Sequence, residues 1–168
     1  MSTTTDKPVK SPILIDQALL DKVSAEAQSH PRLRKNFNFH NSDTDRCHRL
    51  LNAIEPASYL APHRHLDPDK DETMIVVRGR LGIVLFDDFG QVIQTQMLEA
   101  GHANCGITLP HGLFHTLISC APKTVMFESK AGPYLPLNAN ERAIWAPGEG
   151  EVGVAAYAKM LRKLFGLA

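Results

Sequence analysis

Short apolar runs separated by Pro, Gly, Asp and Asn dominate the chain from Phe37 onward. This pattern is typical of an antiparallel all-β domain, because each run is long enough for one strand and each break is rich in turn-forming residues. Two breaks, residues 78–80 and 87–90, are predicted to be hairpin turns. The pattern predicts strands near residues 36–40, 47–54, 57–63, 72–78, 81–87, 91–98, 104–109, 113–120 and 123–129.

A helix is predicted near each end of the chain. Asp16 can cap a helix that runs to about Ser29, where His30-Pro31 ends it. Past Gly153, apolar residues recur at helical spacing as far as Phe165, with basic residues on the opposite side. We expect this short amphipathic helix to pack on its own domain or on a second subunit rather than on a membrane.

Closure into a barrel or a double-sheet sandwich would remove the exposed edges of so many short strands. The expected fold class is therefore all-β, with helices only at the ends. A length of 168 residues with 43% hydrophobic residues fits one such domain. Its expected parts are a flexible tail at 1–12, a helical segment at 13–35, a barrel at 36–130, and a wrapping arm with the C-terminal helix at 131–168.

Composition and charge argue against several classes of protein. No run approaches the roughly 20 apolar residues that span a bilayer, and the polar first dozen residues lack the core of a secretory signal. Eighteen basic and eighteen acidic residues cancel, so no overall field attracts nucleic acid. We therefore expect a cytoplasmic protein that binds neither nucleic acid nor membranes. The widely spaced Cys47, Cys105 and Cys120 are interpreted as free thiols.

Candidate metal ligands lie at positions that strand geometry can bring together. Side chains two residues apart in a strand point to the same face, so His63 and His65 can present two imidazoles to one point. Glu72 would point inward among apolar neighbours, where a carboxylate needs a cation or hydrogen-bond donors. If His115 also points inward, it supplies a third imidazole from another strand. Such a set suits one divalent ion of Zn, Fe(II), Mn, Ni or Co and leaves one or two positions open.

The remaining histidines and some charged residues receive other interpretations. Four histidines that have no other candidate metal ligand at a suitable spacing are interpreted as solvated or loop residues: His30, His40, His102 and His111. Four side chains are candidate helpers in the same cavity, with ordinary surface charge as the favoured interpretation; they are Arg46, His48, Arg49 and Glu128. His48 is the least certain of these, because its predicted strand can face the cavity.

Two stretches of sequence resemble the two motifs of the cupin superfamily. They are HRHLDPDKDETMIVVRG, from His63 to Gly79, and PHGLFH, from Pro110 to His115. The gap between the histidines and the glutamate of the first stretch is longer than usual for that motif. The resemblance implies a cupin-type double-stranded β-helix, a small jelly-roll barrel, with a mononuclear metal bound by His63, His65, Glu72 and His115.

A narrower resemblance covers most of the chain. RCHRLLNAIEPASYLAPHRH, DETMIVVRGRLGIVLFDDFG, GLFHTLISCAPKTVMFESKAGPY and WAPGEG are together similar to the WbuC family of cupin-fold metalloproteins. Members of that family are associated with bacterial surface-polysaccharide and O-antigen biosynthesis. The resemblance thus implies a small-molecule ligand such as a sugar or nucleotide sugar, and the cupin motifs imply a homodimer.

The residues leave the type of activity open. One hypothesis is an enzyme whose metal polarises a carbonyl group for isomerisation or epimerisation. Another is a non-catalytic module or accessory protein that binds a small ligand, or that uses the metal only for stability. A third is an Fe(II)-dependent dioxygenase, although that chemistry normally uses a less saturated ligand set.

Overall fold

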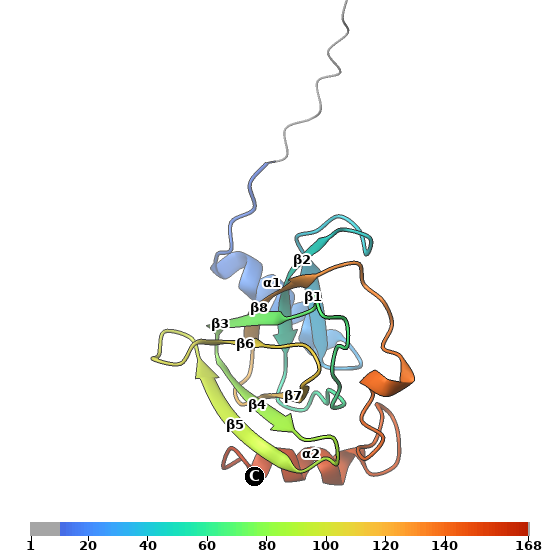
Figure 1. Cartoon of the computed structure of the whole chain (residues 1–168). Coiled ribbons are helices and arrows are strands. Elements are labelled where there is room, and N and C mark those ends of the chain that lie inside the picture. The colour runs from blue at the N-terminus through green and yellow to red at the C-terminus, as the bar shows by residue number, and fades with distance from the viewer. Residues whose placement is uncertain (1–10, 168) are drawn as a thin grey trace, which may run out of the picture.

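Two antiparallel sheets make up the centre of the molecule (Figure 1). The computed structural model describes residues 11–167, so most of the expected tail at 1–12 lies outside the described residues. One sheet has the spatial order β1 (Arg34–Asn38), β2 (Cys47–Ile54), β8 (Thr124–Ala131), β3 (Glu72–Arg78) and β6 (Gly106–Leu109). The other has the order β5 (Val92–Glu99), β4 (Arg80–Phe86) and β7 (Phe114–Ser119). The predicted all-β class is confirmed.

Both predicted helices are present. α1 (Gln17–Ser29) begins after Asp16, whose side chain accepts a hydrogen bond from the Leu19 N–H at 2.9 Å, so the predicted cap is confirmed. α2 (Val154–Lys163) begins after Gly153, and the short 3-10 helix η1 (Ala139–Glu141) precedes it. Across residues 11–167, no helix combines the length and the apolar character needed to cross a membrane.

The predicted strand at residues 57–63 is wrong. This stretch is irregular, and only His63 makes an isolated β-bridge within it. Pro62 lacks the N–H group that a strand ladder requires, so an apolar run alone is not enough to form a strand here. The other predicted strands are present, with ends that differ by at most two residues.

Only one of the two predicted hairpin turns is correct. The turn at residues 87–90 joins β4 to β5, which pair antiparallel. Residues 78–80 instead carry the chain from one sheet to the other, because β3 pairs with β6 and β8 whereas β4 pairs with β5 and β7. Gly79 has a φ of 77°, and a Cβ there would lie 2.6 Å from Thr124 Oγ1. Glycine is therefore needed at this crossing.

Each terminal helix covers part of the outer face of one sheet. The apolar side of α1 packs against Leu51 and Val125 of the five-stranded sheet. α2 and Trp145 pack against Val84 and Phe86 of the three-stranded sheet, so the C-terminal segment of the same chain buries this face. A third apolar cluster fills the space between the sheets at one end, and the other end is left for polar side chains.

The burial of α2 predicts a large effect of truncation. Leu161 is fully buried, whereas its neighbour Met160 is 43% exposed. We expect Leu161→Ala to lower the free energy of unfolding by about 2–5 kcal/mol, because it leaves a cavity beneath the helix. Urea denaturation would measure this, with Met160→Ala as a control that changes stability by about 0.5 kcal/mol or less. Equal small losses in both variants would show that α2 lies outside the cooperative core.

Candidate functional site

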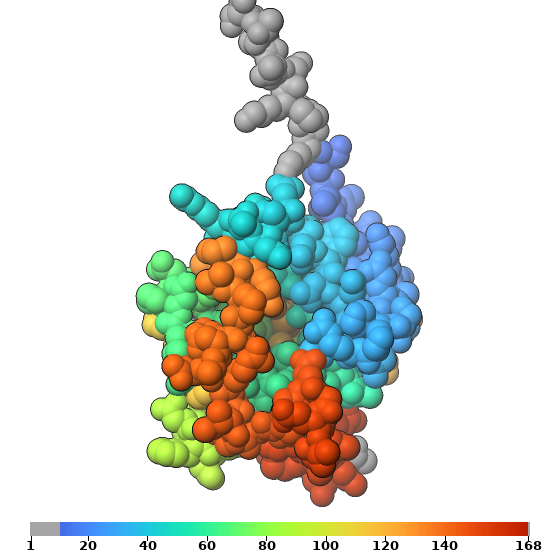
Figure 2. Space-filling model, turned by 90° about the vertical axis from the view of Figure 1, so that its right-hand side faces the viewer, coloured from blue at the N-terminus to red at the C-terminus, as the bar shows by residue number. Residues whose placement is uncertain are grey.

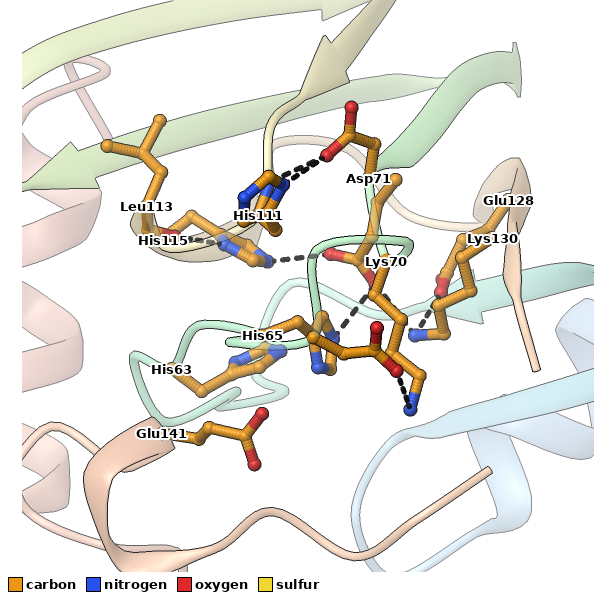
Figure 3. Close-up of polar contacts among 12 residues, drawn as sticks. His63, His65, Lys70, Asp71, His111, Leu113, His115, Glu128, Lys130 and Glu141 are labelled. Carbon is orange, nitrogen blue, oxygen red and sulfur yellow. Dashed lines mark hydrogen bonds and ion pairs between the residues drawn. The ribbon is translucent and has the colours of Figure 1, made fainter. Parts of the chain in front are cut away.

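Backbone pairing places His63 beside His115 of β7. The His63 N–H donates to the His115 carbonyl at 3.0 Å, and the His115 N–H donates to the His63 carbonyl at 2.9 Å. Residues paired in this way project their side chains to the same side, and the two ring centroids are 4.6 Å apart. The His65 ring lies 5.5 Å from His63 and 6.4 Å from His115. The three histidines predicted from the sequence therefore come together (Figure 3).

Glu72 opens β3 with its carboxylate between two of these rings. His65 Nε2 lies 3.1 Å from Glu72 Oε1, and His115 Nε2 lies 3.1 Å from Glu72 Oε2. The side chain is only 4% exposed. The long gap after His65 is taken up by a turn in which the Lys70 N–H donates to the Asp67 carbonyl at 2.9 Å. Glu72 thus reaches the inward position that the sequence predicts.

Backbone carbonyl groups orient two of the rings. His63 Nδ1 lies 3.1 Å from the Ala61 carbonyl, and His115 Nδ1 lies 3.0 Å from the Leu113 carbonyl. A carbonyl oxygen only accepts, so Nδ1 carries the proton and Nε2 of the neutral ring presents a lone pair. Metal-binding histidines are commonly held in this way. Glu72 Oε2 is buried without a hydrogen-bond partner. In the neutral form of the His115 ring with its proton on Nδ1, His115 Nε2 and this oxygen are two acceptors 3.1 Å apart, which a proton or a metal ion would bridge.

Lys130 of β8 contacts the same carboxylate. Its Nζ lies 2.7 Å from Glu72 Oε1 and 2.7 Å from Glu128 Oε1. Burial alone would lower the pKa of Lys130, but the charges of Glu128 and Glu72 outweigh it and raise the pKa above its usual value. Sequence reasoning missed Lys130. Its alternation with Glu128 on one strand was a signal, but the pairing of β8 with β3 was needed to place it beside Glu72.

The local environment sets the charges at the site. Burial would raise the pKa of Glu72, but contacts with His115 and His65 and the charge of Lys130 outweigh burial and hold this pKa well below its usual range. Burial, with a smaller effect of His115, lowers the pKa of His63 to about 3. The site therefore contains an ionised carboxylate and a neutral imidazole at pH 7.

The spacing of the rings is compatible with one shared ion. Metal–nitrogen bonds of about 2.1 Å place the centroids of two bound imidazoles about 4.5–6.4 Å apart, depending on the angle at the metal. As the side chains stand, the described residues 11–167 contain no group of three or more His, Cys, Asp or Glu that could hold a metal ion. The donor types and ring spacing fit a divalent ion that would take over the contacts between Glu72 and the rings.

The site lies at the inner end of a cavity. The inner part, of about 360 Å³, is lined by His63, Glu72 and His115, and the outer part has a volume of about 780 Å³. His63 and Lys130 line both parts, so the two parts adjoin. The opening lies between the C-terminal arm, residues 132–153, and the segment around β1, where Figure 2 shows a hollow between the orange and the blue atoms.

The other residues considered from the sequence separate into buried and exposed groups. His48 and Glu128 are buried and line the cavity, so their interpretation as surface charge is wrong. Arg46 and Arg49 are exposed and line neither part of the cavity, as expected. His40 is a loop residue, as expected, but it is buried and stacks on His48 with ring centroids 4.0 Å apart. The three cysteines are free thiols, as predicted.

The two antiparallel sheets have the cupin fold. A cupin superfamily protein from Desulfitobacterium hafniense has the same fold with a TM-score of 0.50 and 12% identity, over 74% of this chain and 93% of that protein. A conserved protein of unknown function from Streptococcus pyogenes has a TM-score of 0.50 and 10% identity, over 77% of this chain and 95% of that protein. KdgF from Halomonas sp. has a TM-score of 0.48 and 14% identity, over 61% of this chain and 82% of that protein. At these identities the first two structures establish the fold alone.

The chain belongs to the family described as Domain of unknown function (DUF6016), which matches residues 15–98, half of its length. That range includes His63, His65 and Glu72 and ends before β7. No curated protein matches the chain significantly. The narrower similarity to WbuC proteins stays a prediction.

The low pKa of His63 predicts a pH-dependent stability in metal-free protein. The unfolded chain takes up a proton on this histidine below about pH 6.5, whereas the folded protein does so only near pH 3. The unfolded state thus binds more protons in this window, so the free energy of unfolding rises with pH, by up to about 1.4 kcal/mol per pH unit for one proton. The lowered pKa of Glu72 acts in the same direction below about pH 4.3.

Urea denaturation between about pH 5 and 6.5 isolates the histidine contribution, because free carboxyl groups are ionised there. His63→Asn is expected to have a smaller slope of stability against pH than the wild-type protein. The control His102→Asn, at a side chain that is 66% exposed, is expected to keep the wild-type slope. A slope in His63→Asn equal to that of the wild type would contradict the assigned pKa.

Proposed function

We propose that this protein is a metal-dependent cupin that binds a small polar molecule at one divalent ion held by His63, His65, Glu72 and His115. The observation that best supports the proposal is the arrangement of acceptors around Glu72. The Nδ1 atoms of two histidines face backbone carbonyls, and His115 Nε2 faces a buried carboxylate oxygen that has no hydrogen-bond partner. A cation placed among these atoms would satisfy them together.

Three imidazoles and one carboxylate accept several metals. Zn, Fe(II), Mn, Ni and Co are all compatible with this ligand set, and cellular supply affects which is bound. A bound ion of this kind would act as a Lewis acid on a carbonyl or hydroxyl oxygen at an open position. The Lys130 ammonium has three N–H donors and contacts two carboxylates, so it would donate a further hydrogen bond to an oxygen of a ligand at the inner end of the cavity.

The proposed reaction is isomerisation or epimerisation of a sugar or nucleotide sugar, in keeping with the similarity to WbuC proteins and surface-polysaccharide biosynthesis. A second candidate is binding without catalysis. It is supported by the half-buried Lys130, which forms ion pairs with both Glu72 and Glu128, so that neither carboxylate is free of an ion pair to act as a base. Steady-state assays with nucleotide sugars, with metal-stripped protein as the control, distinguish catalysis from binding.

Removal of two proposed ligands tests the metal site. The double variant His63→Ala/His115→Ala is expected to lose most of its bound metal, because half of the donor set is gone. Elemental analysis of protein purified without an affinity-metal column measures this directly. The wild-type protein is also expected to show a rise in unfolding temperature when the metal is added, since a ligand that binds only the folded state stabilises it.

The control is His102→Ala/His111→Ala, which removes two histidines that are more than 40% exposed in their side chains. This variant is expected to keep the wild-type metal content. Stoichiometric metal in folded His63→Ala/His115→Ala, established by circular dichroism, would reject the ligand assignment.

A further inference from the structure

The wall of the cavity that β1 and β2 form has no role in the proposed metal site. His48 pairs with Lys130 across the sheet, and Asn52 pairs with Asn36. Alternation along β2 sends Leu51 to the outer face, against α1, and sends His48 and Asn52 inward. Both line the inner and the outer parts of the cavity, as His63 does. We call His48 and Asn52 the β2 wall.

The β2 wall contains two buried polar atoms without partners. Within residues 11–167, neither His48 Nε2 nor Asn52 Oδ1 has a hydrogen-bond partner. His48 is only 4% exposed and contacts His40 through ring stacking. Gly132 permits this position, because a Cβ there would lie 2.7 Å from His48 Nε2. Buried polar groups are normally paired, so a molecule in the cavity that reaches these two atoms would gain two hydrogen bonds.

The chemistry of the lining favours hydroxyl groups as that partner. Asn52 Oδ1 only accepts hydrogen bonds, His48 Nε2 donates or accepts according to its tautomer, and the Lys130 ammonium nearby only donates. A hydroxyl group donates and accepts, so adjacent hydroxyls can pair with all three. The outer part of the cavity, of about 780 Å³, has room for a molecule the size of a sugar.

Two arginines at the mouth, Arg32 and Arg142, add a preference for negative charge. Other cationic side chains of the cavity are already in ion pairs: Arg34 with Glu149, and Lys130 with Glu72 and Glu128. By contrast, Arg32 and Arg142 line the outer cavity with exposed side chains that form no ion pair in the part of the chain that the structure describes. They come from opposite sides of the opening, one before β1 and one from the C-terminal arm. Such unpaired guanidinium groups fit a carboxylate or a phosphate.

We propose that the cavity binds a polyhydroxylated anion, with its hydroxyl groups on the β2 wall and its carboxylate or phosphate at Arg32 and Arg142. This proposal rests on the proposed function in that the same cavity holds the ligand, and it names the class of that ligand. The β2 wall contains none of the proposed metal ligands, so its preference for hydroxyl groups is measurable whether or not metal is bound.

Calorimetric titration of the full-length protein with five probes tests the proposal. D-glucuronate and glucose 6-phosphate contain both hydroxyls and an anion, glucose lacks the anion, and glutarate and inorganic phosphate lack the hydroxyls. We expect at least one hydroxylated anion to bind about tenfold or more tightly than both glucose and its hydroxyl-free counterpart. Tighter binding of glucuronate identifies a carboxylate as the anion, and tighter binding of glucose 6-phosphate identifies a phosphate.

Variants assign the two preferences to residues. Asn52→Leu is expected to lower the affinity for the hydroxylated anion about tenfold while leaving that for the hydroxyl-free anion unchanged. Arg32→Ala/Arg142→Ala is expected to weaken binding of both anions. Arg46→Ala/Arg49→Ala, which removes two exposed arginines outside the cavity, is the matched control and is expected to bind like the wild type.

A stability measurement keeps the test independent of folding. Because Asn52 Oδ1 is buried without a partner, replacement by leucine is expected to leave the unfolding temperature of ligand-free protein unchanged or higher. The proposal is overturned if no hydroxylated anion binds more tightly than its hydroxyl-free counterpart at millimolar concentrations. It is also overturned if Asn52→Leu binds both anions with the same affinities as the wild-type protein. Metal content measured on the same samples reports separately on the proposed function.

Discussion

The burial of the Glu72 carboxylate is the constraint on which the rest of the site depends. An ionised carboxylate removed from water is costly unless positive charge or donors surround it. Here Lys130 supplies one charge, but His115 presents an acceptor to the second oxygen, which lacks a hydrogen-bond partner. The polar contacts around Glu72 are therefore incomplete on the side of the histidines, and that side faces the cavity.

The fold explains why this polar cluster is tolerated inside a small protein. Apolar side chains of the terminal helices cover part of both outer faces of the sandwich, and one end of the interior is filled by an apolar cluster. Stability thus comes from regions away from the site. The opposite end of the same sheets can then carry His63, Glu72 and Lys130 without loss of the fold.

The sequence predicted the parts of the site that depend on local geometry. The spacing of His63 and His65 predicted that their rings share one centre, although the segment that holds them is irregular apart from the bridge at His63. The inward position of Glu72 follows from the apolar pattern of β3. The sequence did not predict Lys130 or Asn52, and it named His48 as a candidate for the cavity but favoured the surface. The place of these residues depends on the pairing of β8 with β2 and β3, which joins residues far apart in the chain. The same limit explains the error at Gly79, where local turn chemistry does not reveal that the chain changes sheets.

The ligand geometry of the metal-loaded protein tests the central claim most directly. Anomalous diffraction from crystals of that protein locates the ion without any assumption about activity. The account predicts one dominant peak within about 2.0–2.3 Å of the Nε2 atoms of His63, His65 and His115 and of a Glu72 oxygen. A dominant peak at surface histidines such as His102 or His111, with the Glu72 carboxylate still held between His65 and His115, would contradict it.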